Sequence, residues 1–280
     1  MEIGLEVWGN DVDQLLAACR HADEVGIDLF AYGESPHDLN LECWTVLAAL
    51  AAATEQIRLG PVIANVIPEF RSAFLLARQA ETLDTIAPGR IELRTGVGAA
   101  TPHARPWWEP HGIHYPDYEQ RLADLEAALE LWADRASNRG SCVPVTVAAT
   151  GDRALALAAR HAEVWETSFC TPDQYVERRR RFETALAASP APDRRVVRCL
   201  EIDGFVGTTS EAVDRVLASA RADRGPTEDL DAIFVRALVG APDRVADHLG
   251  RLAEVGVDRV LVALHDPLDL DAITALAQAR

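Results

Sequence analysis

A short segment of this chain has the residue types of a phosphate-binding turn. Its members are Ala149, Thr150, Gly151, Asp152 and Arg153, and they lie between a run that predicts a strand and a run that predicts a helix. A small turn containing glycine exposes backbone N–H groups, and the N-terminus of the helix adds a partial positive charge. Arg153 could add a charge-assisted hydrogen bond and Thr150 a hydroxyl, provided that Asp152 points away. The alternative is an ordinary loop in which Asp152 is the helix N-cap.

A second candidate for ligand contact is the G-x-G turn formed by Gly96, Val97 and Gly98, which follows a predicted strand at 90–97. Without a Cβ atom, the glycine backbone can approach a flat ring closely. The alternative is a plain tight turn.

Histidines gather in loops that are predicted to lie at one rim of the fold: His37, His103, His111 and His114. An imidazole titrates near neutral pH and can pass a proton when a reaction leaves charge on a substrate. We rank His37 first and His103 second as proton donors, and the alternative for each is a solvent-exposed loop residue. Their spacing matches no metal-ligand pattern, so no metal site is predicted.

Aromatic residues at the same rim are candidates for substrate contact. Trp8 follows the first predicted strand, Tyr32 ends the second, and Trp107 lies in a long Pro-, His- and Trp-rich segment, 98–116. Core packing is the alternative for any buried aromatic side chain.

Short β-branched runs alternate with longer Ala- and Leu-rich runs of helical period along the whole chain. Strands are predicted at 3–7, 28–32, 57–64, 90–97, 143–149, 164–168, 196–206 and 259–264. The first helix is capped by Asp11 or Asp13 and ends at Gly26, and further helices are predicted at 42–54, 73–86, 118–132, 153–161, 172–188, 210–222, 242–255 and 269–279.

This alternation predicts an α/β fold with a parallel sheet covered by helices, and the strand number predicts a single (β/α)8 TIM barrel domain over residues 1–280. The alternative is an open doubly wound sheet. That fold would favour a G-x-G-x-x-G turn after the first strand, which Gly4 and Gly9 do not supply.

Charge and composition exclude several classes of function. The net charge is -17, which disfavours binding to nucleic acid or to an anionic membrane surface. All 27 basic residues are arginine, so lysine Schiff-base chemistry is excluded. The first residues lack a basic segment followed by an apolar one, and no stretch of about 18 apolar residues occurs. We expect a soluble cytoplasmic protein that acts on a small molecule.

Five collinear stretches resemble the luciferase-like monooxygenase family, whose members are flavin- or coenzyme F420-dependent oxidoreductases. They begin with ADEVGIDLFAYGE (22–34) and a long block from LAALAAATEQIRLG to LRTGVG (47–98), and continue with RLADLEAALELW (121–132), ATGDRALALAARHAEVWE (149–166) and VGAPDRVADHLGRLAEVGVDRVLV (239–262). The resemblance implies a (β/α)8 barrel that holds a flavin or a 5-deazaflavin at its C-terminal rim. It also implies redox chemistry on a small organic substrate.

The resemblance assigns further residues to the cofactor. The end of the third strand, Val62, Ile63, Ala64 and Asn65, resembles the segment that braces the flavin ring, with a non-prolyl cis peptide at Val62–Ile63 and Asn65 at the ring edge. The alternative for Asn65 is a loop cap. Arg121 resembles a family arginine near the cofactor entrance.

Many relatives carry an acidic residue and a histidine just after the second strand. Here Glu34 keeps the acidic position, Ser35 stands where the histidine is usual, and His37 is displaced by two residues. Glu34 is therefore a catalytic candidate together with His37 and His103.

The family implies two chemistries, because a 5-deaza ring cannot form the peroxide that oxygen activation needs. We expect hydride transfer with coenzyme F420, since the Lys-free, Ala- and Arg-rich sequence suggests a GC-rich genome and many such organisms make this coenzyme. The alternatives are an FMNH2-dependent monooxygenase using O2, a barrel that has lost its cofactor and acts as a binding partner, and an unrelated barrel enzyme. Many relatives are dimers, which makes a homodimer the expected assembly.

Overall fold

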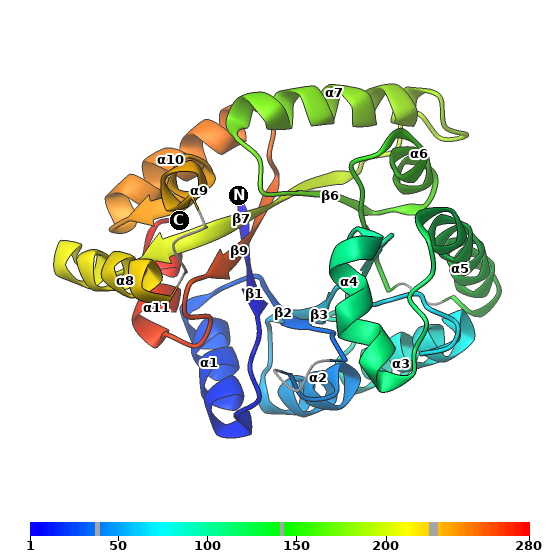
Figure 1. Cartoon of the computed structure of the whole chain (residues 1–280), viewed down its shortest axis with the longest axis horizontal. Coiled ribbons are helices and arrows are strands. Elements are labelled where there is room, and N and C mark those ends of the chain that lie inside the picture. Colours follow the sequence, from blue (N-terminus) through cyan, green and yellow to red (C-terminus); the bar gives the residue numbers. More distant parts are fainter. Residues whose placement is uncertain (37–39, 141–142, 224–228) are drawn as a thin grey trace.

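Eight parallel strands form a nearly closed barrel in the computed structural model, which describes residues 1–36, 40–140, 143–223 and 229–280 (Figure 1). The barrel strands are β1 (Glu2–Val7), β2 (Leu29–Gly33), β3 (Arg58–Val62), β4 (Leu93–Gly96), β5 (Val145–Ala148), β6 (Val164–Ser168), β7 (Val197–Val206) and β9 (Arg259–Leu264). Their order is β3-β2-β1-β9-β7-β6-β5-β4. Single parallel bridges, Leu59 with Ile91 and Ala64 with Thr95, join β3 to β4 and complete the ring. The predicted barrel is confirmed.

Most helices form a ring outside the strands (Figure 1). They are α1 (Val12–Val25), α2 (Cys43–Ala53), α3 (Ala73–Ile86), α5 (Tyr118–Arg139), α6 (Asp152–His161), α7 (Pro172–Ala187), α8 (Ser210–Asp223), α10 (Pro242–Glu254) and α11 (Leu270–Gln278). Local signals set their ends: Asp11 accepts a hydrogen bond from Gln14 N at the start of α1, and Gly26 ends that helix with φ +85°.

Helix α5 is longer than its apolar period predicts, because a tertiary ion pair supports its last turns. The prediction ended near Trp132, but the helix runs on to a left-handed cap at Gly140. In the added part, Arg135 pairs with Glu81 of α3 at 2.7 Å. The apolar period in the sequence therefore predicted only the part of α5 that packs on the barrel.

The segment 98–116, predicted without regular structure, contains helix α4 (Thr101–Trp108) and the short 3-10 helix η1 (Glu109–His111). Figure 1 shows α4 inside the ring of outer helices. Pro106 lies inside α4 and lowers its helix propensity, and packing overrides it: Ala104 and Trp108 are buried in a small cluster with Ile67 and Tyr115. Helix α9 (Leu230–Arg236) and strand β8 (Leu238–Gly240), which pairs with β7, were also not predicted.

Side chains on the inner face of the barrel are of two kinds. A small apolar cluster fills its middle: Leu29, Ala31, Val62, Val164, Cys199 and Leu261. Charged residues lie at other levels of the interior, and they are considered with the site. Across the described ranges, no helix is long and apolar enough to cross a membrane.

Candidate active site

A pocket of about 640 Å³ opens at the carboxyl ends of the barrel strands. Residues from the carboxyl-terminal parts of β1, β3, β4, β5, β6 and β7 line it. The loop after β2, helix α4 and the start of α6 complete the lining. The carboxyl ends of the strands are where enzymes with this fold bind their substrates. Most predicted site residues belong to these same segments.

One wall of the pocket is formed largely by backbone. Val62 and Ile63 line it, and the peptide bond between them is cis, as the resemblance implied. Gly96 lies on the neighbouring strand, where a Cβ atom would be 3.1 Å from Ile63 Cδ1. Ala64 does not line the pocket. Its backbone carbonyl accepts a hydrogen bond from Thr95 Oγ1 at 3.0 Å and so helps to join β3 to β4.

The turn after β4 needs glycine at position 98, the second glycine of the G-x-G sequence. Gly98 has φ +80°, and a Cβ atom there would be 2.6 Å from the Tyr115 hydroxyl. That hydroxyl donates to Ala99 O at 2.9 Å and holds the turn in place. Gly96, Val97 and Gly98 all line the pocket, so the G-x-G turn presents backbone to a bound ligand.

Arg121 braces this turn from behind and does not line the pocket. Its guanidinium donates to Val97 O at 2.8 Å, to Ala99 O at 3.1 Å and to Pro116 O at 2.5 Å. It also lies over the Tyr115 ring, 4.5 Å from the centroid. Because the residue is buried, it positions the wall and does not supply a free cation to the pocket.

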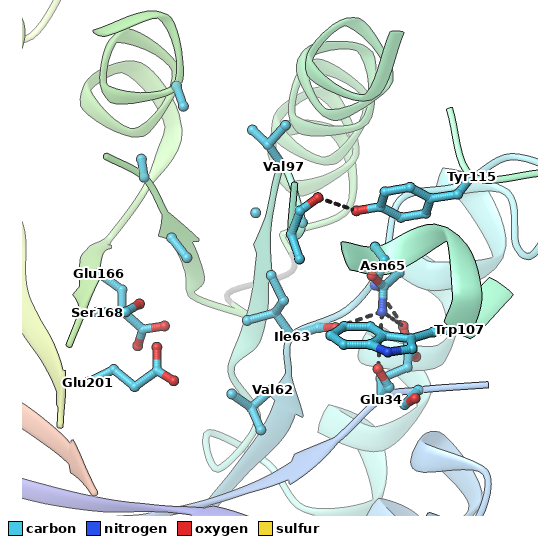
Figure 2. Close-up of a pocket in the computed structure, with 18 of the residues that line it drawn as sticks. Glu34, Val62, Ile63, Asn65, Val97, Trp107, Tyr115, Glu166, Ser168 and Glu201 are labelled. Carbon is cyan, nitrogen blue, oxygen red and sulfur yellow. Dashed lines mark hydrogen bonds between the residues drawn. The ribbon is translucent and has the colours of Figure 1, made fainter. Parts of the chain in front are cut away.

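Glu34 is a buried carboxylate that organises the loop after β3 (Figure 2). Its Oε2 accepts hydrogen bonds from Asn65 N at 2.6 Å and from Arg71 Nη2 at 2.7 Å, and its Oε1 accepts one from Trp44 Nε1 at 3.1 Å. Asn65 lines the pocket, so Glu34 sets the position of a wall residue. A carboxylate with this many partners positions neighbours better than it moves protons.

The predicted phosphate turn faces the pocket with its small residues. Ala149, Thr150 and Gly151 line it, and α6 begins directly afterwards. Gly151 is the N-cap of α6 and supplies no side-chain cap, so the first helical N–H groups remain available. Among the described lining residues there is no arginine or histidine, and an anionic group would depend on backbone N–H and hydroxyl donors.

Asp152 and Arg153 lie outside the pocket. The exposed Asp152 carboxylate pairs with Arg181 of α7 at 2.5 Å, so it points away, as a phosphate site requires. Arg153 pairs with Glu119 of α5 at 2.5 Å and is exposed as well. The predicted direct contact of Arg153 with a phosphate is therefore not present in this arrangement.

Two of the three predicted aromatic residues line the pocket, Trp8 and Trp107. The Trp8 indole lies flat on Gly33, where a Cβ atom would be 2.4 Å from the ring, and its Nε1 donates to Glu6 Oε1 at 2.8 Å. Tyr32 requires a correction. It is fully buried away from the pocket, and its hydroxyl donates to Gly9 O, so it ties two loops together and does not contact substrate.

The predicted histidines contribute little to the described pocket. His103 lies on α4, exposed, and does not line it; the nearby His111 and His114 are exposed too. His37 lies outside the described residues. Within the described ranges, no cluster of three metal-ligating side chains occurs.

Sequence reasoning missed the acidic floor of the pocket. Glu6 of β1, Glu166 of β6 and Glu201 of β7 all line it, together with Ser168. Figure 2 shows the Glu166 and Glu201 carboxyl groups directed toward one another, across the pocket from Val62 and Ile63. Burial and the neighbouring Glu6 raise the pKa of Glu201 well above its ordinary value. The signal available in the sequence was a glutamate inside an otherwise apolar parallel strand, a rare combination because both faces of such strands are buried.

Carboxylates deeper in the barrel have cationic partners. Glu92, just before β4, pairs with Arg259 at 2.7 Å and Arg94 at 3.1 Å, and it accepts a hydrogen bond from Thr146 Oγ1 at 2.6 Å. Although burial alone would raise its pKa, the two arginines lower the pKa of Glu92 to about 2. Arg94 also contacts Glu166 at 2.5 Å and so links this network to the pocket floor.

These features define a (β/α)8 barrel with a rim pocket of the size and lining that suit a small-molecule or cofactor site. The family model described as luciferase-like monooxygenase matches residues 3–259. The chain therefore belongs to the luciferase-like monooxygenase family.

Relatives of known activity differ in the cofactor they use. Pyrimidine monooxygenase RutA of Caulobacter segnis is 37% identical over 94 residues, which cover 32% of this chain and 25% of that protein, so the match spans about a quarter of its length. An F420-dependent secondary alcohol dehydrogenase in complex with an F420-acetone adduct superposes with a TM-score of 0.81 and 16% identity, covering 100% of this chain and 99% of the other. The oxygenating constituent of 3,6-diketocamphane monooxygenase from Pseudomonas putida, in complex with FMN, has a TM-score of 0.75 and 18% identity, covering 99% and 97%. At such identities the structural likeness shows the fold alone.

The residues present fit a flavin or a 5-deazaflavin. Val62 and Ile63 line the pocket beside Gly96 and Gly98, which have no side chains, so backbone is available there for a planar ring to lie against. The uncapped start of α6 suits a phosphate.

Proposed function

We propose that this protein transfers a hydride between coenzyme F420 and a small organic substrate. The observation that carries the proposal is the combination, in one pocket, of a backbone wall at Val62, Ile63 and the G-x-G turn with the uncapped N-terminus of α6. A planar ring and an anionic tail need these two surfaces.

One point favours the deazaflavin. Hydride transfer to or from a carbon–oxygen group requires a proton donor or acceptor, and the acidic floor of the pocket supplies candidates.

In this proposal Val62, Ile63 and the turn at Gly96 to Gly98 hold the ring, while Thr150 and the first N–H groups of α6 hold the phosphate. When bound, the deazaflavin supplies two-electron hydride transfer. Glu34 and Arg121 keep the two wall segments in place, and Trp8 and Trp107 cover the substrate side of the pocket.

The second candidate is an FMNH2-dependent monooxygenase using O2. The match to pyrimidine monooxygenase RutA, at 37% identity over 94 residues, is the observation that favours it. The same wall and the same phosphate turn would serve FMN.

Side-by-side titration of the protein with F420 and with FMN, followed by fluorescence, tests the proposal. We expect F420 to bind more tightly. Tighter binding of FMN would favour the monooxygenase, and no binding of either cofactor would overturn both candidates.

A matched pair of variants tests the phosphate turn. Gly151 has φ -82°, and a Cβ atom there would meet only the Tyr118 hydroxyl at 3.4 Å, so a side chain is tolerated. Gly151→Asp and Gly151→Asn both introduce a good helix N-cap, but only aspartate adds a negative charge. We expect both variants to keep or gain thermal stability, and Gly151→Asp to lose at least tenfold more cofactor affinity than Gly151→Asn. Equal affinities would argue against an anion at this turn.

A further inference from the structure

The floor of the pocket contains carboxylate oxygens without donors. Glu6 and Glu166 are buried, with 9% and 0% of their surface exposed. Glu6 Oε1 accepts from Trp8 Nε1 and Glu166 Oε2 from Arg94, but the buried Glu6 Oε2 and Glu166 Oε1 have no hydrogen-bond donor among the described residues. Buried polar atoms are rarely left unsatisfied, so such atoms in a pocket indicate a proton or a ligand.

Glu6, Glu166 and Glu201 bring three carboxyl groups together on the floor of one pocket. Two ionised carboxylates have only acceptor oxygens, so Glu6 and Glu201 can share a hydrogen bond only when one of them carries a proton. Such a proton would also give a donor to an oxygen such as Glu6 Oε2, which otherwise has none among the described residues.

The surrounding charges favour the proton on Glu201. Burial raises the pKa of Glu201, and so do the negative charges of Glu6 on β1 and of Glu166 on the adjacent strand β6. Arg94 contacts Glu166 at 2.5 Å and, at a lower level of the barrel, Glu92, which Arg259 contacts as well.

Asp203, two residues after Glu201 on β7, forms an ion pair with Arg236 of α9, with 3.7 Å between Asp203 Oδ2 and Arg236 Nη2. His265, after β9, is near Asp223 at 3.3 Å and does not line the pocket. No positive group of the described chain therefore faces the Glu201 carboxyl from the pocket.

We propose that Glu201, protonated against Glu6 on the floor of the pocket, is the acid that donates a proton to the carbonyl oxygen of a ketone or aldehyde substrate. Glu6 is a positioning residue, held in turn by the Trp8 indole over Gly33. The inference rests on the proposed hydride transfer and adds to it the substrate class and the proton donor.

With a ketone as substrate, a bound reduced deazaflavin would supply a hydride, carrying both electrons, to the carbonyl carbon, where the new C–H bond forms. The π electron pair of the C=O bond moves to the oxygen, which takes the Glu201 proton to give the alcohol. Glu201 is left as a carboxylate and regains a proton from water.

Infrared spectroscopy of the protein without cofactor tests where the proton lies. We expect the C=O stretch of a protonated carboxyl group at neutral pH in the wild-type protein, its loss in Glu201→Gln, and its disappearance at lower pH in Glu6→Gln, which removes the neighbouring charge. Glu177→Gln, an exposed carboxyl on α7 paired with Arg180, is the control and should leave the band unchanged. A band that is absent from the wild type, or that survives in Glu201→Gln, would overturn the proposal.

Kinetics with reduced F420 test the role of the proton. With acetone and cyclohexanone as probes, we expect the wild type to oxidise the cofactor, and Glu201→Gln to be slower by about 10²-fold or more while its F420 affinity stays within threefold of wild type. An unchanged rate in Glu201→Gln, or a wild type that binds F420 but reduces neither ketone, counts against the inference. If neither F420 nor FMN binds to the wild type, the proposed function fails, and the infrared result still decides whether Glu201 holds a proton.

Discussion

Glu92 and Glu201 both point into the barrel, one near the amino ends of the strands and the other near the carboxyl ends. Glu92 contacts Arg259, Arg94 and the Thr146 hydroxyl, and its pKa is lowered to about 2. Glu201 contacts Glu6 and Ser168, and its pKa is raised well above the ordinary value. Burial opposes ionisation in both places, so the neighbours decide the direction.

This difference separates a stabilising region from a functional one. At the lower level every carboxylate that we describe has an arginine partner, as buried charges require. At the upper level, burial and the nearby Glu6 and Glu166 carboxylates raise the pKa of Glu201. Oppositely shifted pKa values in one interior are typical of sites where some groups hold the fold and others react.

The largest effect that we expect is on the lower network. Glu92→Gln leaves Arg94 and Arg259 without the carboxylate that both contact, and removal of one partner of a buried ion pair destabilises a protein by about 3–5 kcal/mol. Chemical denaturation at pH 7 measures this loss, with the exposed pair variant Glu177→Gln as control, for which a much smaller change is expected because solvent screens the pair. Because the Glu92 pKa is lowered, its contribution is present above pH 4.5 and is lost as the pH falls through about 2, so the two proteins should converge in strong acid. A loss no larger than that of the control would mean that the lower network does not stabilise the barrel.

The next effect concerns Glu201 and has the opposite pH dependence. A carboxyl whose folded-state pKa is raised binds its proton more tightly in the folded state, so its contribution is complete below its ordinary pKa of about 4.5 and is lost as the pH rises toward the raised value. In that window we expect the free energy of unfolding of the wild type to fall by up to about 1.4 kcal/mol per pH unit from this group. Glu201→Gln cannot lose a proton and should remove this slope, as measured by denaturation between pH 5 and pH 8. If the free energy of unfolding depends on pH in the same way in the wild type and in Glu201→Gln, the pKa of Glu201 is not raised.

A pair of hydroxyl variants sharpens the comparison on a smaller scale. Thr146→Val removes the 2.6 Å hydrogen bond to Glu92, and we expect a loss of about 1–2 kcal/mol in denaturation, since Arg94 and Arg259 still contact the carboxylate. Ser168→Ala removes a hydrogen bond that lowers the pKa of Glu201, so the infrared band of the protonated carboxyl should persist to higher pH. A band that disappears at lower pH in Ser168→Ala would place the Ser168 hydroxyl as an acceptor of the Glu201 proton.

The smallest effect is expected at the rim, where ion pairs are exposed. Arg153 is paired with Glu119, so Arg153→Ala should weaken cofactor binding by less than about tenfold in a fluorescence titration. Glu119→Gln, which frees Arg153, is the matched variant. A loss well above tenfold in Arg153→Ala would show that this arginine turns toward the phosphate when the cofactor binds.

The barrel and much of the pocket wall could be predicted from the sequence because their signals are local. The alternation of β-branched and helical runs, the Gly26 cap and the glycines at Gly96 and Gly98 each reflect a conformational requirement of a few neighbouring residues. The candidate phosphate turn was predicted in the same way, on the condition that Asp152 points outward, and the exposed Asp152 carboxylate pairs with Arg181 of α7.

Helix α4 and the positions of Arg153 and Tyr32 could not be predicted, because distant contacts decide them. Packing of Trp108 against Tyr115 outweighs the interior Pro106 of α4, and Arg153 pairs with Glu119 of another helix outside the pocket. Tyr32 sits at a predicted strand end, but its side chain faces the surrounding helices and not the barrel interior.

By itself the sequence determined the order of strands and helices, the glycines that let the backbone line a pocket, and the family to which the chain belongs. The tertiary structure alone decided which of its many glutamates meet a cation and which meet each other. Glu6, Glu166 and Glu201 are separated by up to 195 positions and come together only when the barrel closes. The proton affinity of a buried carboxyl depends on charges within a few ångströms, and such distances exist only in the folded chain.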